Sequence, residues 1–241
     1  MRTDVRLDAI HDLVDANHVL VRRDILDGFG HVSVRNPEDP ATFLISRSLA
    51  PGLVVEDDIQ VVALDGTTTD TRPSYLERFI HAEIYRARPD VHAVVHSHSA
   101  SMVPFSISRT PLRAVWHMAG FLGDATPVFE VRDTAGDGSD LLIRSAALGA
   151  DLADVLGNGA VTLMRGHGFV AVGDSIPQAV ARAVYADLNA RAQATAIQLL
   201  GDYTALTVEE GRAASETNDG QLGRAWEIWR AEAGRTRGAA V

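Results

Sequence analysis

The sequence predicts one α/β domain built on a mixed or antiparallel sheet. Short apolar runs typical of strands alternate with longer segments of helical spacing, and helices bracket a strand-rich central block. Gly, Pro and Asp separate the runs, as in short hairpin turns. The chain has 241 residues, of which 46% are hydrophobic, so it can bury a sizeable core.

The first part of the chain predicts a helix, three strands and a second helix. Apolar residues recur at helical spacing over residues 5–26, and residues 30–35 alternate as a strand. Residues 42–46 and 59–64 are further strands. Pro73 and Ser74 then open a helix of about 15 residues that ends at a Pro-Asp pair.

The second part predicts four strands and three helices. Residues 92–98 and 127–133 read as strands, and residues 141–156 read as a helix. Residues 160–173 read as two strands around an Arg-Gly-His-Gly turn, followed by a helix from Pro177 to about residue 200. The polar C-terminal segment contains an apolar cluster at 225–229, which predicts a docking helix.

The composition excludes several classes of protein. The net charge is −10 and no basic stripe is present, so we expect no nucleic-acid partner. There is no cysteine, which excludes disulfides and thiolate chemistry. The N-terminus lacks a secretory signal and no run of about 18 apolar residues occurs, so we expect a cytoplasmic protein without membrane contact.

Three histidines are candidates for a metal site. His96 and His98 end the strand at 92–98, and side chains two residues apart on a strand point to the same face. Their imidazoles can reach one ion at about 2.0–2.1 Å, although two hydrogen-bonded polar residues would give the same pattern. His167 lies between two glycines in a turn, where packing explains it poorly, and it favours the metal interpretation.

Glu77 is the candidate acid/base and has two interpretations. Ser74 and Glu77 match the spacing of a capping box at a helix start, which would make the carboxylate structural. The same position puts a carboxylate at a helix entrance, shortly before the strand with two histidines. His81 follows on the same helix face, and we expect it at the surface or behind the ligands.

Two further stretches are candidates for substrate binding. Gly30 and His31 lie in a glycine-rich entry to a strand, which lacks the strand-to-helix context of a phosphate loop. Ser46, Arg47 and Ser48 follow another strand, and a guanidinium between two hydroxyls suits recognition of a carboxylate.

In these motifs the sequence resembles the class II aldolase/adducin family. The resemblance runs from about residue 8 to 201 and is carried by GHVSVR (30–35), the segment 72–99 and GHG (166–168). It implies a three-layer αβα fold with a mostly antiparallel sheet of about nine strands. It also implies a catalytic domain at residues 1–205, followed by an extension at 206–241 with a docking helix and a flexible tail.

The resemblance further implies the composition of the active site. One divalent ion per subunit would be held by His96, His98 and His167, with Glu77 as acid/base. Zn²⁺ or Mn²⁺ fits such ligands best, and Fe²⁺ or Co²⁺ is possible. Members are commonly tetramers with sites at subunit boundaries, where His117 would reach a neighbouring site.

The sequence departs from the sugar-phosphate aldolases of this family where they bind phosphate. Their Thr-x-Gly-Asn, Thr-Pro-Thr-Gly and Pro-Ser-Ser-Glu motifs are replaced at residues 28–31, 46–49 and 73–77. The replaced pattern is similar to decarboxylases of hydroxylated aromatic acids, so we expect a metal-dependent decarboxylase of an ortho-hydroxy aromatic acid. The alternatives are an aldolase or epimerase acting on a small sugar or hydroxy-keto acid, and a non-catalytic adducin-like interaction domain.

Overall fold

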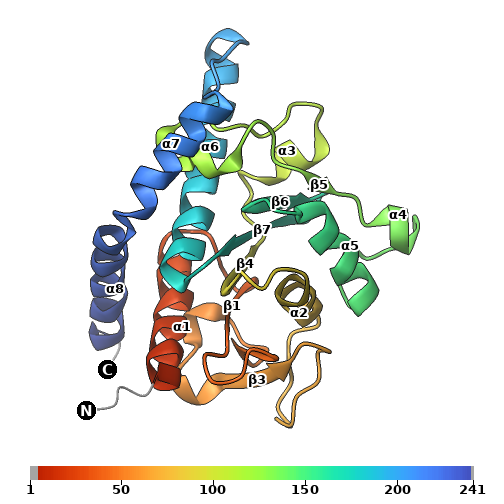
Figure 1. Ribbon diagram of the computed structural model, residues 1–241, viewed down its shortest axis with the longest axis vertical. Helices are drawn as coiled ribbons and strands as arrows, with labels where there is room; N and C mark the ends of the chain where they lie inside the picture. Colours follow the sequence, from red (N-terminus) through yellow and green to blue (C-terminus); the bar gives the residue numbers. More distant parts are fainter. Residues whose placement is uncertain (1–4, 240–241) are drawn as a thin grey trace.

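The computed structural model describes residues 5–239, and all side chains among them except those of residues 200 and 235–239. A seven-stranded sheet lies between two layers of helices (Figure 1). One face carries α1 (Val5–Arg22), α6 (Ile176–Leu200) and α8 (Leu222–Ala239), and the other carries α2 (Arg78–Ala87) and α5 (Ala146–Leu156). The three-layer α/β prediction is confirmed.

The sheet has the strand order β3-β2-β1-β4-β7-β6-β5. The strands are β1 (His31–Arg35), β2 (Thr42–Ser46), β3 (Ile59–Ala63), β4 (Ala93–Ser97), β5 (Val128–Phe129), β6 (Val161–Met164) and β7 (Gly168–Gly173). Every neighbouring pair is antiparallel except β5 and β6, which are parallel. The expectation of a mostly antiparallel sheet is therefore confirmed.

Six further elements complete the described chain. They are η1 (Pro51–Leu53), η2 (Glu56–Asp58), α3 (Val103–Ile107), η3 (His117–Leu122), α4 (Arg132–Ala135) and α7 (Val208–Asp219).

The expected count of about nine strands is wrong, because the described residues form seven. Side chains of α6 bind backbone groups of the segment 111–115 that a neighbouring strand would otherwise pair. Asn189 Oδ1 accepts from the Val115 N–H at 2.9 Å, and Gln193 Oε1 accepts from the Arg113 N–H at 3.0 Å. The segment is thus held by side chains of a helix and does not join the sheet.

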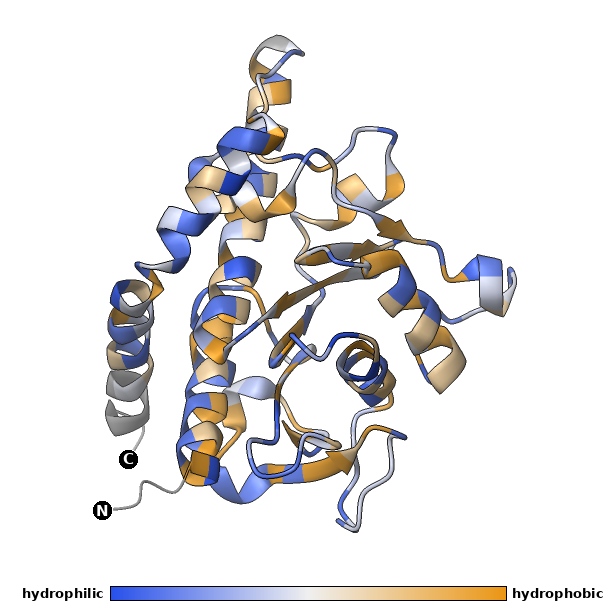
Figure 2. Cartoon of the chain, viewed as in Figure 1, coloured by the Kyte–Doolittle hydropathy of each residue, from blue (hydrophilic) through white to orange (hydrophobic). Residues whose placement is uncertain are grey.

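Alternation along the strands explains why helices cover both faces. Val32 and Val34 of β1 belong to the core under α1 and α6, whereas Phe43 and Ile45 of β2 belong to the core under α2 and α5. Successive side chains of a strand point to opposite faces, so strands that are apolar on both need two helical layers. Figure 2 shows apolar residues concentrated along the central strands.

Two predicted elements extend too far towards their N-termini. The helix expected from Pro73 begins only at Arg78, because the Ser74 hydroxyl donates to Gln60 Oε1 at 2.7 Å and caps no helix. The helix expected over 141–156 begins at Ala146, because Ser145 is extended and its hydroxyl caps the helix by accepting from the Leu148 N–H, and Leu141 has a left-handed φ of 69°.

Two other elements end earlier than predicted. The helix at 5–26 ends at Arg22, before Asp24 with its left-handed φ of 57°. The strand at 127–133 is reduced to Val128–Phe129, because the Glu130 carboxylate accepts from the Arg132 N–H and turns the chain into α4.

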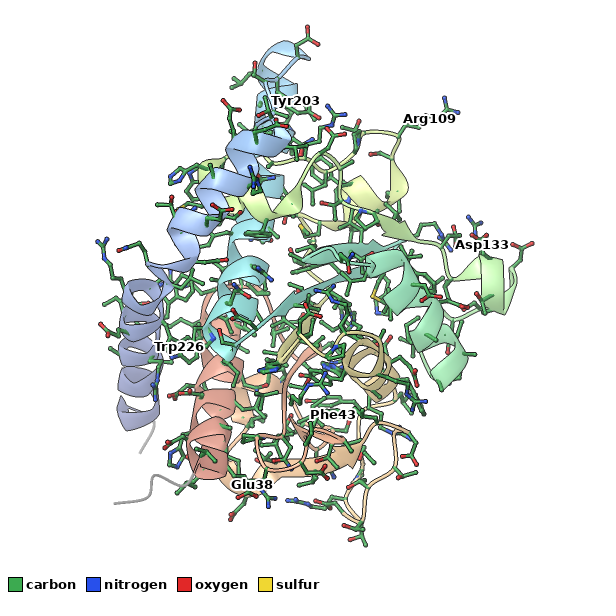
Figure 3. The ribbon with its side chains drawn as sticks, in the orientation of Figure 1. Glu38, Phe43, Arg109, Asp133, Tyr203 and Trp226 are labelled. Carbon is green, nitrogen blue, oxygen red and sulfur yellow. The ribbon has the colours of Figure 1, made fainter. Side chains whose placement is uncertain are left out.

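The C-terminal segment packs on the helical layer formed by α1 and α6. Trp226 and Trp229 of α8 are buried in the same core as α1, and Figure 3 shows the labelled Trp226 between these helices. The flexible tail expected beyond α8 falls on residues 240–241, outside the described residues. Among the described residues, no helix is long and apolar enough to cross a membrane.

Candidate metal centre

Two neighbouring strands bring the three histidines together. His96 lies in β4, His98 follows it, and His167 lies in the turn that joins β6 to β7, the strand paired with β4. His98 Nε2 lies 3.0 Å from His96 Nε2 and 2.9 Å from His167 Nε2. Two nitrogens bound about 2.1 Å from one ion would lie about 3.0–3.4 Å apart, so this spacing fits a shared cation.

The outer nitrogens of two of these rings are fixed by backbone carbonyls. His96 Nδ1 lies 3.1 Å from the Phe169 carbonyl oxygen, and His167 Nδ1 lies 2.9 Å from that of Leu141. A carbonyl can only accept, so each Nδ1 carries a proton and Nε2 is the nitrogen that can bind a metal. The left-handed Leu141 therefore has a function, because it presents its carbonyl to His167.

Glu77 faces the histidines and is not a capping residue. Its side chain makes no cap hydrogen bond to α2, so the capping-box interpretation is wrong. One carboxylate oxygen accepts from the Ile143 N–H at 3.0 Å. The other lies 3.5 Å from His96 Nε2 and 3.6 Å from His167 Nε2. One donor atom from each of Glu77, His96, His98 and His167 lies within 4.8 Å of the others.

The protonation states of these groups suit a cation. Burial alone would raise the pKa of Glu77, but contacts with His96 and His167 and the Ile143 N–H lower it to about 2. Burial, together with the neighbouring His96, lowers the pKa of His98 to about 4 and also lowers that of His167. At neutral pH the cluster thus offers the uncharged imidazoles of His98 and His167 and the carboxylate of Glu77, donors that fit a divalent ion.

Of the predicted substrate residues, Gly30 and His31 lie beside this cluster. Gly30 has a φ of 79°, and a Cβ there would lie 2.8 Å from the His96 carbonyl oxygen, so only glycine fits. His31 pairs with His96 across β1 and β4, and their ring centroids are 5.0 Å apart.

In the single chain, the other predicted substrate residues either connect to the histidine cluster through other side chains or make no described contact with it. The Ser46 hydroxyl bonds to the Tyr75 hydroxyl at 3.1 Å, and the Tyr75 ring lies 4.6 Å from that of His31. Arg47 Nε donates to Asp58 at 2.7 Å, and Ser48 is exposed.

His117 is exposed on η3. Its carbonyl accepts from the Asn218 side chain at 2.9 Å. It makes no described contact with the histidine cluster.

Sequence reasoning missed the aromatic and buried polar surroundings of the cluster. Phe29 is 70% exposed, with its ring centroid 6.3 Å from that of His98. His81, expected either at the surface or behind the ligands, is fully buried against β1, and the sequence did not predict the buried Tyr85 and Ser33 beside it. The spacing of Glu77, His81 and Tyr85, four residues apart each time, was the signal for one buried polar helix face.

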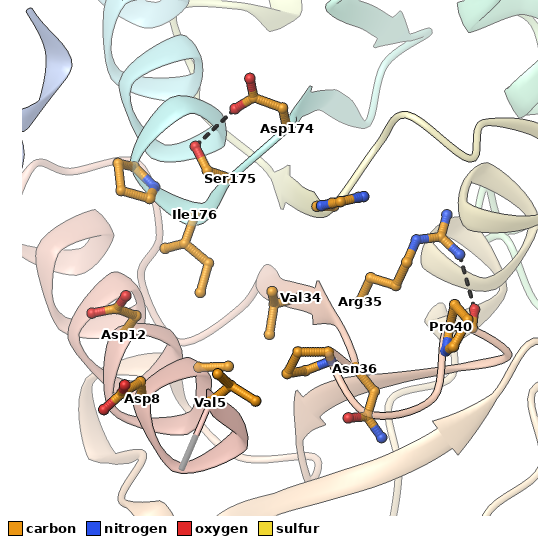
Figure 4. Close-up of a pocket in the computed structure, with 14 residues that line it drawn as sticks. Val5, Asp8, Asp12, Val34, Arg35, Asn36, Pro40, Asp174, Ser175 and Ile176 are labelled. Carbon is orange, nitrogen blue, oxygen red and sulfur yellow. Dashed lines mark hydrogen bonds between the residues drawn. The ribbon is translucent and has the colours of Figure 1, made fainter. Parts of the chain in front are cut away.

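A large hollow is separate from this chemistry. A cavity of about 570 Å³ lies between the start of α1 and the turns at Asn36 and Asp174 (Figure 4), and none of the four cluster residues lines it. A smaller hollow of about 240 Å³ has His98 in its wall, beside the loop from Asp24 to Asp27.

The buried histidine on α2 makes the fold sensitive to acid. Burial lowers the pKa of His81 from 6.5 to about 3, so between these values the unfolded chain binds a proton that the folded chain does not. Stability from neutral His81 is therefore complete above pH 6.5 and is lost as the pH falls towards 3. We expect His81 to contribute a slope of up to ~1.4 kcal/mol per pH unit to the free energy of unfolding.

Urea unfolding of the metal-free protein over a pH series measures this slope. His81→Gln should reduce it, whereas His11→Gln, at an exposed position of α1, should leave it unchanged. An equal slope in wild type and His81→Gln would contradict the assignment.

Comparison with known proteins agrees with this fold and identifies a family. Residues 11–194 match the family model described as Class II Aldolase and Adducin N-terminal domain. The decarboxylase tropJ of Talaromyces stipitatus is 38% identical over 91% of this chain and 92% of its own length. A 3,4-dihydroxyphthalate decarboxylase of Arthrobacter keyseri is 30% identical over 71% of this chain and 72% of its own.

A solved structure shares the architecture. L-fuculose 1-phosphate aldolase from Glaciozyma antarctica superposes with a TM-score of 0.79 at 21% identity, covering 98% of this chain and 94% of its own. Because the family model spans most of the chain, this protein belongs to the class II aldolase and adducin N-terminal domain family.

Proposed function

We propose that the protein is a metal-dependent carbon–carbon lyase that removes CO₂ from an ortho-hydroxy aromatic carboxylic acid. The observation that carries this proposal is the convergence of Glu77, His96, His98 and His167 donor atoms within 4.8 Å of one another. The names of the two relatives above support decarboxylation over aldol cleavage.

The three histidines would hold the ion, and Glu77 would face it. A bound divalent ion would act as a Lewis acid towards a substrate oxygen and stabilise the negative charge that develops as the carbon–carbon bond breaks. We favour Mn²⁺ or Zn²⁺, and imidazole with carboxylate also suits Fe²⁺ or Co²⁺.

Glu77 would move the proton that the reaction requires. Its low pKa makes it a carboxylate at neutral pH, so it can accept the proton of the phenolic hydroxyl. It would then deliver that proton to the ring carbon that bears the carboxylate. Departure of CO₂ restores the aromatic ring, and the phenolate oxygen regains a proton from solvent.

The surrounding side chains would bind the rest of the substrate. Arg47 is oriented by Asp58 through Nε, and its terminal nitrogens make no hydrogen bond within the described residues, so they are free for a second carboxylate. The side chains of Ser46, Ser48 and His31, with the backbone of Gly30, would complete the polar wall. The exposed ring of Phe29 supplies an apolar surface suited to an aromatic ring.

Metal removal tests the proposal directly. We expect chelation to reduce CO₂ release from ortho-hydroxy aromatic acids at least a hundredfold, and stoichiometric Mn²⁺ or Zn²⁺ to restore it. CO₂ release is measured with a panel of such acids, and salicylate analogues that lack the ortho hydroxyl serve as controls. Unchanged turnover after chelation would contradict the proposal.

The same assay separates a second candidate, an aldolase acting on a ketose phosphate. Its support is the shared fold with L-fuculose 1-phosphate aldolase. Brisk cleavage of a ketose phosphate without CO₂ release from any acid would favour it.

We also propose a homotetramer in which His117 reaches a neighbouring subunit's site. Its exposure on η3 supports this role. Residues 1–205 would form the catalytic domain and residues 206–241 an extension docked through α8.

A further inference from the structure

A chain of buried hydrogen bonds runs from α2 to the side of the metal cluster. The Tyr85 hydroxyl lies 2.8 Å from Ser33 Oγ, and Ser33 Oγ lies 2.6 Å from His81 Nδ1. His81 Nε2 in turn lies 2.6 Å from His31 Nδ1. None of these four side chains is needed to hold the metal.

The order of the chain follows from the fold. His31 and Ser33 point from β1 to the same face of the sheet, and His81 and Tyr85 lie one helical turn apart on α2. The labelled Phe43 of β2 lies beneath this region (Figure 3), with its ring nearly parallel to that of His81 at 6.1 Å. Each member is at most 3% exposed, so bulk water does not compete for these hydrogen bonds.

The Tyr85 hydroxyl sets the donor-to-acceptor direction of this series of hydrogen bonds. Burial raises the pKa of Tyr85, so the group stays a phenol with one proton to donate. Ser33 Oγ is its near acceptor at 2.8 Å, whereas the His92 carbonyl oxygen is 3.5 Å away, too far for a strong hydrogen bond. Tyr85 therefore donates to Ser33.

The remaining protons then have one consistent arrangement. Ser33 Oγ has two hydrogen-bond partners among the described residues, Tyr85 and His81. Because it accepts from Tyr85, it donates its own proton to His81 Nδ1. A ring that accepts at Nδ1 is neutral and carries its proton on Nε2. His81 therefore donates from Nε2 to His31 Nδ1, and the same rule puts the proton of His31 on its own Nε2.

We infer that Tyr85, Ser33 and His81 are positioning residues that hold His31 as the Nε2-protonated tautomer, which makes it a neutral hydrogen-bond donor to a substrate oxygen. His31 Nε2 has no hydrogen-bond partner within the described residues, and its ring lies beside those of His96 and Tyr75. The inference rests on the proposed function for the identity of that oxygen, a phenolate or carboxylate of the aromatic acid.

The fixed tautomer has a consequence for specificity. With a hydrogen-bond donor at His31, the site favours substrates that carry an anionic or carbonyl oxygen at the position of the aromatic ring that faces His31 Nε2. It disfavours analogues that carry an amino group or a hydrogen there, since the donor would then lose its partner.

Neutron diffraction from the perdeuterated, metal-loaded protein tests the tautomer without relying on turnover. The expected result is deuterium on Nε2 of His31 and on Nε2 of His81. Deuterium on His31 Nδ1, on both nitrogens, or divided between them would overturn the inference. If no aromatic acid is decarboxylated, the proposed function fails, while the neutron map still decides the tautomer.

Kinetics of conservative variants test the role of the donor. Tyr85→Phe keeps the ring and removes the donor that orients the chain, and should lower kcat/KM about tenfold, the effect of one neutral hydrogen bond. Tyr203→Phe is the matched control, because it also removes a tyrosine hydroxyl that makes a 2.8 Å hydrogen bond, in this case with Gln193 of α6. The labelled Tyr203 lies beyond the end of α6, away from α2 (Figure 3). Equal effects of the two substitutions would contradict a positioning role.

A second pair of variants separates hydrogen bonding from packing at His31. The side-chain amide of His31→Gln reaches the position of Nε2 with an N–H donor, and His31→Leu fills similar space without one. We expect the glutamine variant to retain about ten times the kcat/KM of the leucine variant. Equal activity of the two would overturn the donor role.

Discussion

Glu77→Gln is expected to lower kcat by at least about a thousandfold while the protein stays folded and keeps its metal. The amide oxygen can still accept from the Ile143 N–H, which Glu77 binds at 3.0 Å, so the local backbone should not change. The amide cannot accept or deliver the proton that decarboxylation requires. Release of CO₂ measures the activity, and elemental analysis measures the metal content.

Glu83→Gln is the matched control for this substitution. Glu83 is also a buried carboxylate on α2, 5% exposed, but it pairs with Arg86 and lies outside the four-residue cluster. Its replacement should leave kcat within about twofold. If kcat of Glu77→Gln fell by less than tenfold, Glu77 would have a structural role, and another group would have to transfer the proton.

The layers of the fold could be predicted from the sequence because the pattern of each strand is local. The histidine cluster was predictable for a similar reason, because His96 and His98 lie two residues apart at the end of one strand and His167 lies in a glycine turn where packing explains it poorly. The structure brings these three residues together as expected.

The start of α2 could not be predicted, because it depends on a residue distant in sequence. Ser74 and Glu77 have the spacing of a capping box, but Gln60 of β3 takes the Ser74 hydroxyl and the carboxylate turns towards the histidines. The predicted number of strands was wrong for the same kind of reason, because the side chains of Asn189 and Gln193 of α6 bind the backbone N–H groups of the segment 111–115. Local propensity does not encode such long-range side-chain bonds.

Gly168→Ala is expected to weaken both the fold and the metal site. A Cβ at Gly168 would lie 2.1 Å from the Ser97 carbonyl oxygen and 3.1 Å from His98 Cα, so β7 and β4 would have to separate. Overpacking of this kind costs ~1–3 kcal/mol of unfolding free energy. Because His167 precedes Gly168 and His98 follows Ser97, the same separation moves two proposed ligands apart, and metal affinity should fall at least about tenfold.

Gly173→Ala distinguishes the two effects. Gly173 ends the same strand far from the cluster, and a Cβ there would lie 2.6 Å from the Ala179 backbone nitrogen. It should destabilise the protein by a similar ~1–3 kcal/mol but leave the metal affinity of the folded fraction unchanged. Urea unfolding and metal titration measure the two quantities separately. If both variants lost metal affinity equally, general loosening of the sheet would explain the result, and the close contact of β7 with β4 at Gly168 would have no special part in holding the histidines.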